Sequence, residues 1–291
     1  MPSPARQGSG ASTNAEPDGP ARPARRELAN RGTSPHTGAI VTFEPRLEIA
    51  AMTSASPRSV TISIDNARRV SGLLQAPKQA HACTVLAHGA GAGMAHPFMV
   101  AVAQGLADRG IVTLRYQFPY MERGSKRPDA PKLAEATVRA AVMEASRLVP
   151  ELALVAGGKS FDGRMTSLAQ ATSPLPGVRG LVFLGFSLHP AGRPSAERGQ
   201  HLFQVQTPML FLQGTRDRLA ELQLVRSLAA QLGARVTLEL LQDADHSFHV
   251  PARTGRKDSE VRAEMLDALA GWIETVISAT PRLQTPPSSQ E

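Results

Sequence analysis

Apolar runs of strand length alternate with amphipathic runs of helix length through this chain, and this alternation restricts the fold more than any other feature. The strand-like runs stand at 82–89, 111–118, 152–158, 178–186, 207–214 and 235–241. The helix-like runs stand at 97–108, 131–149, 163–171, 220–233 and 258–278. Such units bury a mostly parallel sheet between helices on both faces, and two earlier runs, 60–64 and 69–77, are typical of an antiparallel pair. The sequence therefore predicts an α/β domain over residues 57–279.

Both ends of the chain lack this pattern. Residues 1–56 are rich in Pro, Gly, Ser, Ala and Arg without a sustained period, and 280–291 is a second Pro- and Ser-rich stretch. Such a composition buries too little apolar surface to offset the entropy of ordering, so we expect both tails to be disordered. Met52 stands just before the first strand signal, which raises the hypothesis that the native chain starts there.

Charge and cysteine content exclude several classes of protein. Basic residues exceed acidic ones by 32 to 25, and this net charge of +7 favours anionic substrates, but no motif predicts a nucleic-acid partner. Cys83 is the only cysteine, so an intrachain disulfide and a cysteine-based metal site are excluded. No run approaches the roughly 18 apolar residues that cross a bilayer, so no membrane partner is expected. We therefore expect a soluble, cytoplasmic protein with a small-molecule substrate, and the oligomeric state stays open.

The segment "LVAGGKSFDGRM", residues 154–165, has two interpretations. Its "GGKS" resembles the end of a phosphate-binding loop, but that motif requires a glycine five residues before Gly158, where Ala153 stands. The same letters place Ser160 in a tight turn between an apolar strand and a helix. Such a turn raises the serine hydroxyl above the edge of the sheet, where it can act as a nucleophile. The spacing favours this second interpretation.

An acid and a histidine follow two of the later strands. Asp217 comes directly after 207–214, and His246 comes after 235–241. Because the carboxyl ends of parallel strands meet at one edge of a sheet, we expect both residues to lie near Ser160. A serine nucleophile needs a neighbouring base, and the base needs an orienting acid, so the order serine, acid, histidine predicts a catalytic triad. The alternative acids are Glu122, Asp243 and Asp245.

A glycine-rich turn completes the predicted site. In "VLAHGAGAG" the backbone N–H of Ala90 or Gly91 stands where a donor to a substrate oxyanion is needed, together with the N–H of Phe161. His88 is expected to orient this turn by hydrogen bonding rather than to bind a metal, because no second ligand stands at a suitable spacing. The predicted chemistry requires no cofactor and no metal.

The motifs "HGAGAGMAHPFM", "GGKSFDGRM", "FLQGTRD" and "DADHSFH" together resemble those of the dienelactone-hydrolase-like α/β-hydrolases. Within that group the chain is most similar to the subgroup of the testis-expressed protein 30 and KANSL3-type proteins. The resemblance covers about residues 59–277. It implies an α/β-hydrolase fold and a serine esterase or lactonase whose triad is Ser160, Asp217 and His246. It also implies an alternative, because some members of the subgroup act as scaffolds: a weakly active or inactive interaction module.

Asp162 departs from the resemblance, since the family's turn is similar to G-K-S-x-G-G-R and this chain has aspartate at the first glycine of the pair. One interpretation is a structural cap, because a carboxylate is favoured at a helix N-terminus by roughly 0.3–1 kcal/mol. The other places the charge near the reaction, where it would raise the pKa of His246 or repel an anionic intermediate. The second interpretation favours the inactive alternative.

The expected substrate is a small soluble ester, and the more specific hypothesis is an anionic one. Only about twenty residues, 187–207, separate two of the predicted strands where lipases insert a lid, so we predict an open site without a lid domain. Candidate substrate-binding residues in the loops at the active edge are His88, Arg123, Lys126 and His189. For the charged members of this set, a solvated loop is the alternative.

Overall fold

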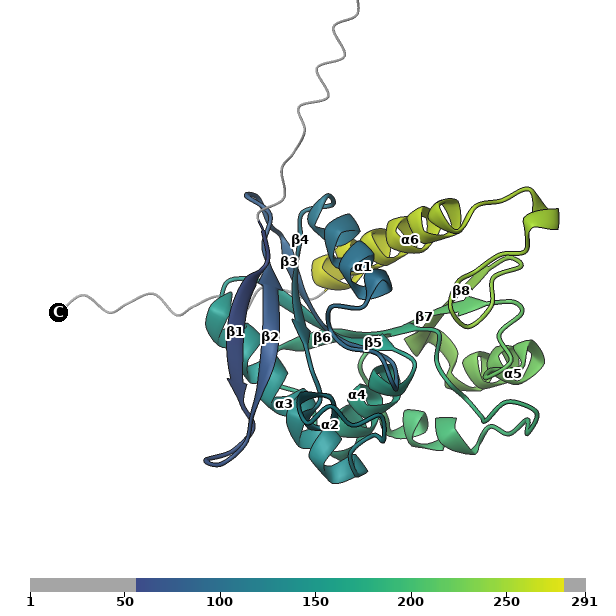
Figure 1. Cartoon of the computed structure of the whole chain (residues 1–291). Coiled ribbons are helices and arrows are strands. Elements are labelled where there is room, and N and C mark those ends of the chain that lie inside the picture. Colours follow the sequence, from purple (N-terminus) through teal and green to yellow (C-terminus); the bar gives the residue numbers. More distant parts are fainter. Residues whose placement is uncertain (1–55, 280–291) are drawn as a thin grey trace, which may run out of the picture. The chain divides into compact units, whose positions relative to one another are not determined.

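Eight strands form the sheet of the described part of the chain, in the order β1-β2-β4-β3-β5-β6-β7-β8 (Figure 1). The computed structural model describes residues 56–279, so the predicted tails lie outside the described residues except for Ser56. The strands are β1 (Arg58–Ser63), β2 (Arg69–Gln75), β3 (Ala82–Ala87), β4 (Ile111–Tyr116), β5 (Ala153–Lys159), β6 (Val178–Leu184), β7 (Met209–Gly214) and β8 (Val236–Leu241). β1 pairs with β2 and β2 with β4 in antiparallel register, as predicted for the first pair, and the other pairs are parallel.

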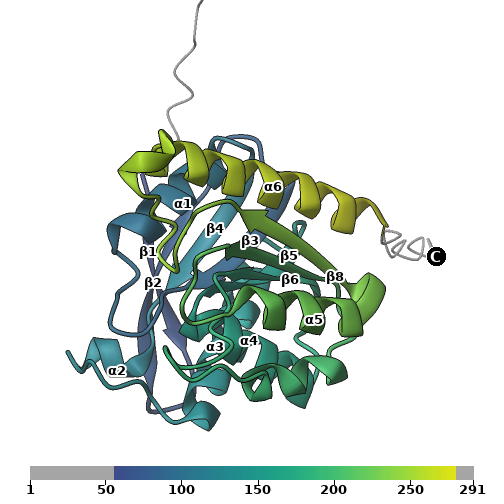
Figure 2. The same ribbon diagram turned by 90° about the vertical axis from the view of Figure 1, so that its right-hand side faces the viewer.

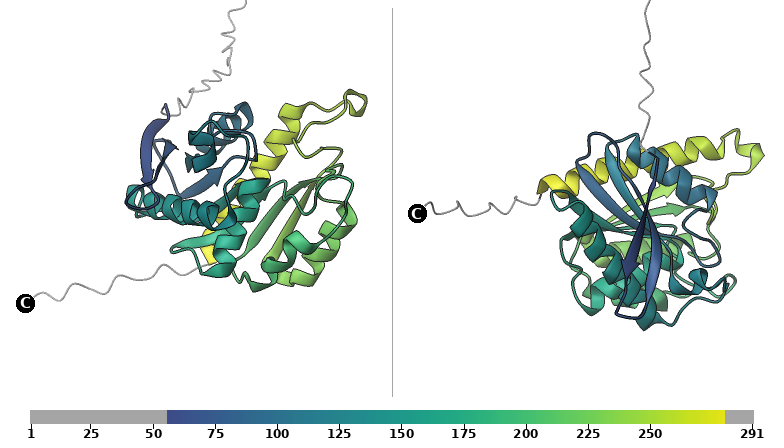
Figure 3. Two further views of the ribbon diagram at one scale, coloured as in Figure 1. Left: turned by 60° about the horizontal axis from the view of Figure 1, so that its bottom comes forward. Right: turned by 60° about the vertical axis from the view of Figure 1, so that its left-hand side comes forward.

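Helices cover both faces of this sheet. They are α1 (Pro97–Ala107), α2 (Pro119–Glu122), α3 (Pro131–Leu148), α4 (Phe161–Thr172), α5 (Leu222–Leu232) and α6 (Asp258–Ala279), with 3₁₀ helices η1 (Glu197–Gln204), η2 (Gly233–Arg235) and η3 (Ala252–Thr254). Figure 2 shows α1 and α6 on one face of the sheet and α3, α4 and α5 on the other. β1 and β2 form one edge of the sheet (Figure 3).

The period-two pattern of the strands explains these two layers. In β3 the side chains of Cys83 and Val85 pack in the core beneath α3, α4 and α5, whereas Ala82 and Leu86 pack beneath α1 and α6. Every residue of β3, β4 and β7 is buried, because the central strands are covered on both faces. This explains why these strands are continuous apolar runs in the sequence. A sheet with one exposed face would show alternating apolar and polar residues.

The chain order and the sheet order differ at β3, which lies between β4 and β5. This reversal separates the loops that follow neighbouring parallel strands and opens a crevice at their carboxyl ends. The loops after β3, β5, β7 and β8 all leave the sheet at that edge. They carry Ala90, Ser160, Asp217 and His246.

The short helices α2, η1, η2 and η3 were not predicted, because helices of three to eight residues show too little periodicity in the sequence. In the predicted lidless segment between β6 and β7, the structure has η1 alone as regular secondary structure among the described residues. No helix in residues 56–279 combines the length and the apolar character that a membrane span requires.

Candidate active site

Ser160 occupies a strained turn between β5 and α4. Its backbone has φ 53° and ψ −99°, a conformation that residues with a side chain rarely adopt and that is maintained only when the surroundings enforce it. Two neighbouring strands supply that constraint. A Cβ added to Gly157 would lie 1.8 Å from the carbonyl oxygen of Val182, and one added to Gly158 would lie 2.4 Å from that of Ala87. The glycines before Ser160 therefore let β5 end tightly between β3 and β6, and the chain must turn sharply at the serine.

Asp217 and His246 are joined by a hydrogen bond, with 2.7 Å between the aspartate Oδ2 and the histidine Nδ1. The aspartate side chain is fully buried, whereas the imidazole is 23% exposed. The backbone N–H of Leu219 donates to the other carboxylate oxygen, Oδ1, at 2.7 Å. These contacts fix the carboxylate and leave the Nε2 atom of His246 as the ring nitrogen not bound to Asp217.

Gln213 is a positioning residue that the sequence interpretation missed. Its side chain is fully buried at the end of β7, where Nε2 donates to Asp217 Oδ2 at 2.6 Å and Oε1 accepts from the N–H of Phe186 at 2.9 Å. The amide therefore holds the carboxylate that holds His246. The available signal was a glutamine inside the otherwise apolar run "MLFLQG".

Ser160 and His246 line one cleft of about 350 Å³. The other residues that line it are Gly89, Ala90, Ala92, His96, Phe98, Met99, Lys159, Leu219 and Ser247. No hydrogen bond joins Ser160 Oγ to His246 Nε2 within residues 56–279, as is common in free enzymes, where this contact tightens when substrate binds. The cleft thus brings together the hydroxyl of Ser160 and the imidazole of His246, and the carboxylate of Asp217 is hydrogen-bonded to that imidazole.

The predicted oxyanion turn follows β3 and approaches the serine. A Cβ added to Gly89 would lie 3.6 Å from Ser160 Cβ, Ala90 lines the cleft, and Gly91 has a positive φ of 77°. Phe161 N–H lies at the first residue of α4, next to the serine. The donor roles of Ala90, Gly91 and Phe161 stay predictions.

The side chain of His88 anchors this turn by contacts with the backbone. The imidazole is buried, its Nδ1 lies 2.9 Å from the carbonyl oxygen of Gly89, and its Nε2 accepts from the N–H of Phe118 at 3.4 Å. Burial lowers the pKa of His88 below its ordinary value, which favours the neutral ring that these two contacts need. Both ring nitrogens are thus occupied by the backbone.

Asp162 points beneath the turn, and its side chain is fully buried. Oδ2 accepts from the N–H of Ala87 at 2.6 Å, and Oδ1 accepts from Tyr116 Oη at 2.8 Å and from Thr166 Oγ1 at 3.2 Å. Asp162 is not among the residues that line the cleft. The expected cap of its own helix is therefore replaced by a link from α4 to β3 and β4.

Packing explains why an aspartate fits at position 162 while the next residue remains glycine. A Cβ added to Gly163 would lie 3.1 Å from both the carbonyl oxygen of Gly158 and the ring of Phe183. A side chain at Gly163 would therefore crowd β5 and β6. At Asp162 the surroundings offer hydrogen-bond donors, and burial raises the pKa of its carboxyl to about 7.

The ammonium of Lys159 supports the loop that carries His246. Its Nζ donates to the backbone carbonyl of His246 at 2.6 Å and lies 5.3 Å from the ring centroid of Phe248. Burial lowers the pKa of Lys159 to about 8, although the carboxylates of Asp217 and Asp245 oppose this effect. The sequence interpretation weighed this lysine only as part of a phosphate-binding loop and missed this contact.

Replacing Lys159 by methionine is expected to lower kcat about tenfold, because it removes a charge-assisted hydrogen bond worth about 1.5–3 kcal/mol from the His246 loop. Wild-type kcat should fall as pH rises through about 8, since the ammonium then loses its proton. Steady-state ester hydrolysis from neutral to alkaline pH measures both effects. Lys159→Met should lack that alkaline decrease, and Lys159→Arg should retain most of the activity at neutral pH. An unchanged pH profile in Lys159→Met would contradict the positioning role.

The four predicted substrate-binding residues lie outside the lining of the cleft. His189 is buried, with Nε2 accepting from the N–H of Glu221 at 2.8 Å and Nδ1 at 2.9 Å from the carbonyl oxygen of Pro190. Arg123 pairs with Asp129 at 2.8 Å. Lys126 is exposed, as the solvated-loop interpretation expects. Substrate contact by His88, Arg123, Lys126 and His189 stays a prediction, and their contacts here favour structural roles.

Residues 56–279 hold no group of three or more His, Cys, Asp and Glu side chains arranged to bind a metal ion. Cys83 is buried within β3, and burial raises the pKa of its thiol to about 12. The thiol is thus a packing group in the core. The chemistry available at this edge of the sheet comes from the serine, the imidazole and the carboxylate.

Comparison with known proteins gives the same picture of the fold. Residues 80–274 match the family model described as an alpha/beta hydrolase domain. The chain is similar to an alpha-beta serine hydrolase homologue from Coxiella burnetii (18% identity, 74% of this chain and 98% of that chain, TM-score 0.60). It is also similar to a serine hydrolase described as without lid from Xanthomonas campestris (22% identity, 78% and 97%, TM-score 0.58). A third likeness is to a dienelactone hydrolase from Anabaena variabilis (20% identity, 78% and 100%, TM-score 0.58). At such identities the structural likeness shows the fold, and the predicted fold class is confirmed.

Proposed function

The chain belongs to the alpha/beta hydrolase family, whose domain matches residues 80–274, and from this premise we propose that it is a serine hydrolase of small esters or lactones. One observation carries the proposal. Ser160 stands in a strained turn and lines a cleft that is also lined by His246, and His246 is hydrogen-bonded to the buried Asp217. A strained backbone at a cleft is the usual sign of a functional residue.

The proposed reaction proceeds by acyl transfer. Ser160 Oγ attacks the ester carbonyl carbon while His246 Nε2 takes the hydroxyl proton, and Asp217 stabilises the resulting imidazolium through Nδ1. The N–H groups of Phe161 and of Ala90 or Gly91 donate to the oxyanion. Collapse of the tetrahedral intermediate expels the alcohol, which receives the proton from His246. Water, activated by the same imidazole, then releases the acid and restores the serine.

The second candidate function, a weakly active or inactive interaction module, rested on the position of Asp162 and on the subgroup resemblance. The contacts of Asp162 with Ala87, Tyr116 and Thr166 remove the first of these reasons, because they direct its carboxylate away from the cleft. Within the family we propose the dienelactone-hydrolase-like group and its subgroup of testis-expressed protein 30 and KANSL3-type proteins. A cytoplasmic location is part of the same proposal.

Labelling by a fluorophosphonate probe tests the function directly. The probe phosphonylates a serine only where a neighbouring base activates the hydroxyl and the probe can reach it. Ser160 lines the cleft whereas Ser167, which contacts His201, is fully buried, so we expect a single labelled peptide that contains Ser160. Ser160→Ala should abolish the label, and Ser167→Ala, which changes another serine of the following helix, should retain it. A screen of short p-nitrophenyl esters then defines the acyl length. A protein that stays folded but takes up no label would favour the interaction module.

A further inference from the structure

A hollow of about 430 Å³ lies between α4 and η1, and it is named here the α4–η1 hollow. No residue of its lining belongs to the lining of the cleft that holds Ser160. The hollow nevertheless lies close to that serine along the chain, because the N–H of Arg164 donates to the carbonyl oxygen of Ser160 in the first turn of α4. The residues that line the hollow are Arg164 and Leu168 on α4 and Glu197, Arg198, Gln200 and His201 on η1.

The guanidinium group of Arg164 is partly buried without a partner from residues 56–279. Its Nε atom is buried and has no hydrogen-bond acceptor there. Burial lowers the pKa of Arg164 below its ordinary value, and the positive charge of Arg198 adds to this effect. The carboxylate of Glu197 lines the same hollow, but within the described chain it forms an ion pair with neither arginine. Because buried donors are nearly always hydrogen-bonded, the Nε of Arg164 points to an acceptor from outside the chain.

His201 adds a hydrogen-bond acceptor to this hollow. Its Nε2 lies 2.7 Å from Ser167 Oγ, and that hydroxyl donates to the carbonyl oxygen of Arg164 at 3.0 Å. A hydroxyl has one proton and a carbonyl oxygen can only accept, so His201 carries a proton on Nε2 and donates it to Ser167. Burial and the nearby charge of Arg164 lower the pKa of His201 to about 4, so the ring is neutral near pH 7. Its Nδ1 is then an acceptor without a donor among the described residues.

The α4–η1 hollow therefore offers two positively charged groups and one lone pair. Guanidinium groups present paired N–H donors that match the oxygens of an oxyanion. An unprotonated oxygen placed at His201 Nδ1 would repel the lone pair there, whereas a P–OH group would donate to it. At neutral pH sulfate has no proton, and inorganic phosphate keeps at least one. The lining of the hollow thus distinguishes phosphate from sulfate, although the two ions have the same shape.

We propose that the α4–η1 hollow binds a phosphate that retains a proton, with its oxygens on the guanidinium groups of Arg164 and Arg198 and its P–OH donating to His201 Nδ1. The site lies outside the cleft, so the proposal goes beyond the proposed hydrolase function and does not depend on it. Both arginines are partly exposed, so each contact is modest and is weakened by salt. The expected dissociation constant is about 1 mM at low salt.

Titration of the full chain with inorganic phosphate and with sodium sulfate, followed by NMR near pH 7 at low salt, tests the site without any turnover. We expect phosphate to shift the Nε–H signal of Arg164 and the ring signals of His201 with one shared dissociation constant. Sulfate should bind about tenfold more weakly. Charge alone would give the opposite order, because sulfate carries more negative charge than phosphate at this pH. Sulfate binding as tight as phosphate would overturn the role of His201, and titration without shifts at Arg164 would overturn the site.

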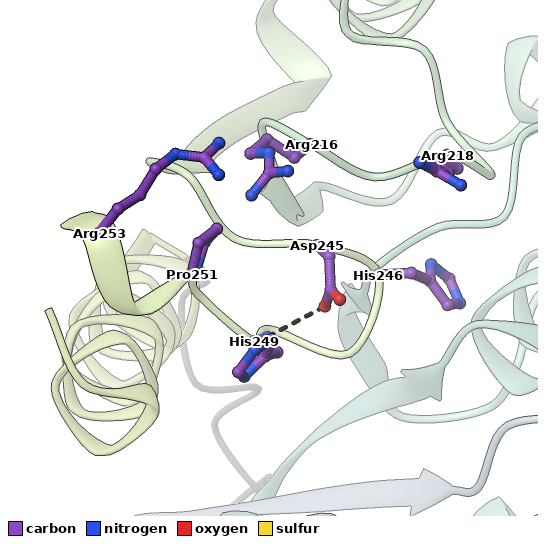
Figure 4. Close-up of a pocket in the computed structure, with 7 residues that line it drawn as sticks. All are labelled: Arg216, Arg218, Asp245, His246, His249, Pro251 and Arg253. Carbon is purple, nitrogen blue, oxygen red and sulfur yellow. Dashed lines mark hydrogen bonds between the residues drawn. The ribbon is translucent and has the colours of Figure 1, made fainter. Parts of the chain in front are cut away.

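Arginine variants then locate the bound phosphate. Arg164→Gln and Arg198→Gln should each weaken phosphate binding about tenfold, measured on the ring signals of His201. Arg193→Gln is the matched control, because Arg193 is an exposed arginine of the same segment between β6 and β7 and lies outside the hollow. Arg216→Gln changes a different basic hollow, which lies among the loops after β7 and β8 (Figure 4), and should also bind as the wild type does. Weakening by Arg193→Gln or Arg216→Gln to the same extent, or none by Arg164→Gln and Arg198→Gln, would show that phosphate does not occupy the α4–η1 hollow.

Discussion

Asp217→Asn is expected to lower kcat by about 10⁴-fold while the protein stays folded. The reason lies in the direction of the hydrogen bonds around the carboxylate. The N–H of Leu219 requires an acceptor at Oδ1, so an asparagine placed here turns its NH₂ group toward His246 Nδ1. The imidazole then accepts at Nδ1 and carries its proton on Nε2, where it cannot take the proton of Ser160.

Gln213 adds an unfavourable contact to this wrong arrangement. Its NH₂ donates to Asp217 Oδ2 in the wild type and would face the NH₂ of the asparagine in the variant. Its carbonyl oxygen accepts from the N–H of Phe186, so the glutamine amide cannot turn over without losing that contact. The measurement is steady-state hydrolysis of a p-nitrophenyl ester, together with a thermal melt to verify folding. Asp243→Asn is the matched control, because Asp243 was an alternative acid on the neighbouring loop and should tolerate the change. A decrease of less than tenfold in Asp217→Asn would mean that Asp217 does not orient the base.

The elements that position the site were predictable because their sequence signals are local. Each central strand is a continuous apolar run, and each long helix shows its own period, so their limits were predicted to within a few residues. The position of Ser160, Asp217 and His246 at one edge of the sheet could be predicted for the same reason, since each follows a strand in a sheet whose loops gather there. The Asp217–His246 contact follows from that topology.

The features that the sequence did not reveal depend on side-chain direction and on contacts between distant segments. A hollow lined by Arg216, Arg218 and Arg253 joins the loop after β7 to the loop after β8 (Figure 4), and nothing in either stretch alone indicates that they meet. Gln213 and Lys159 act through neighbours that only the folded chain supplies. Asp162 was recognised as unusual, but its sequence position gave no indication that its carboxylate points under the helix.

The buried carboxyl of Asp162 is expected to make the stability of the domain depend on pH. Its pKa in the folded protein is about 7, against an ordinary value of 3.8, so the native state binds more protons than the unfolded state between these values. The stabilisation is therefore fully present below about pH 4 and is lost as pH rises through about 7, a change of about 4 kcal/mol. Urea unfolding across this range should show the decrease in wild type. Asp162→Asn cannot titrate, so its free energy of unfolding should lack this component.

Asp162→Gly, which places at this position the glycine that the sequence resemblance implies, provides the contrasting variant. It removes the acceptor for the N–H of Ala87 and for the hydroxyl of Tyr116, and both donors are buried. At about 1–3 kcal/mol for each unsatisfied group, the loss of stability should be about 2–6 kcal/mol, whereas the asparagine keeps one acceptor oxygen and should lose less. Glycine is therefore not a neutral replacement at position 162, because the N–H of Ala87 and the hydroxyl of Tyr116 need an acceptor there. A glycine variant as stable as wild type would show that the link between α4, β3 and β4 does not stabilise the turn that holds Ser160. An asparagine variant with the wild-type pH dependence would show that Asp162 is not the group that titrates.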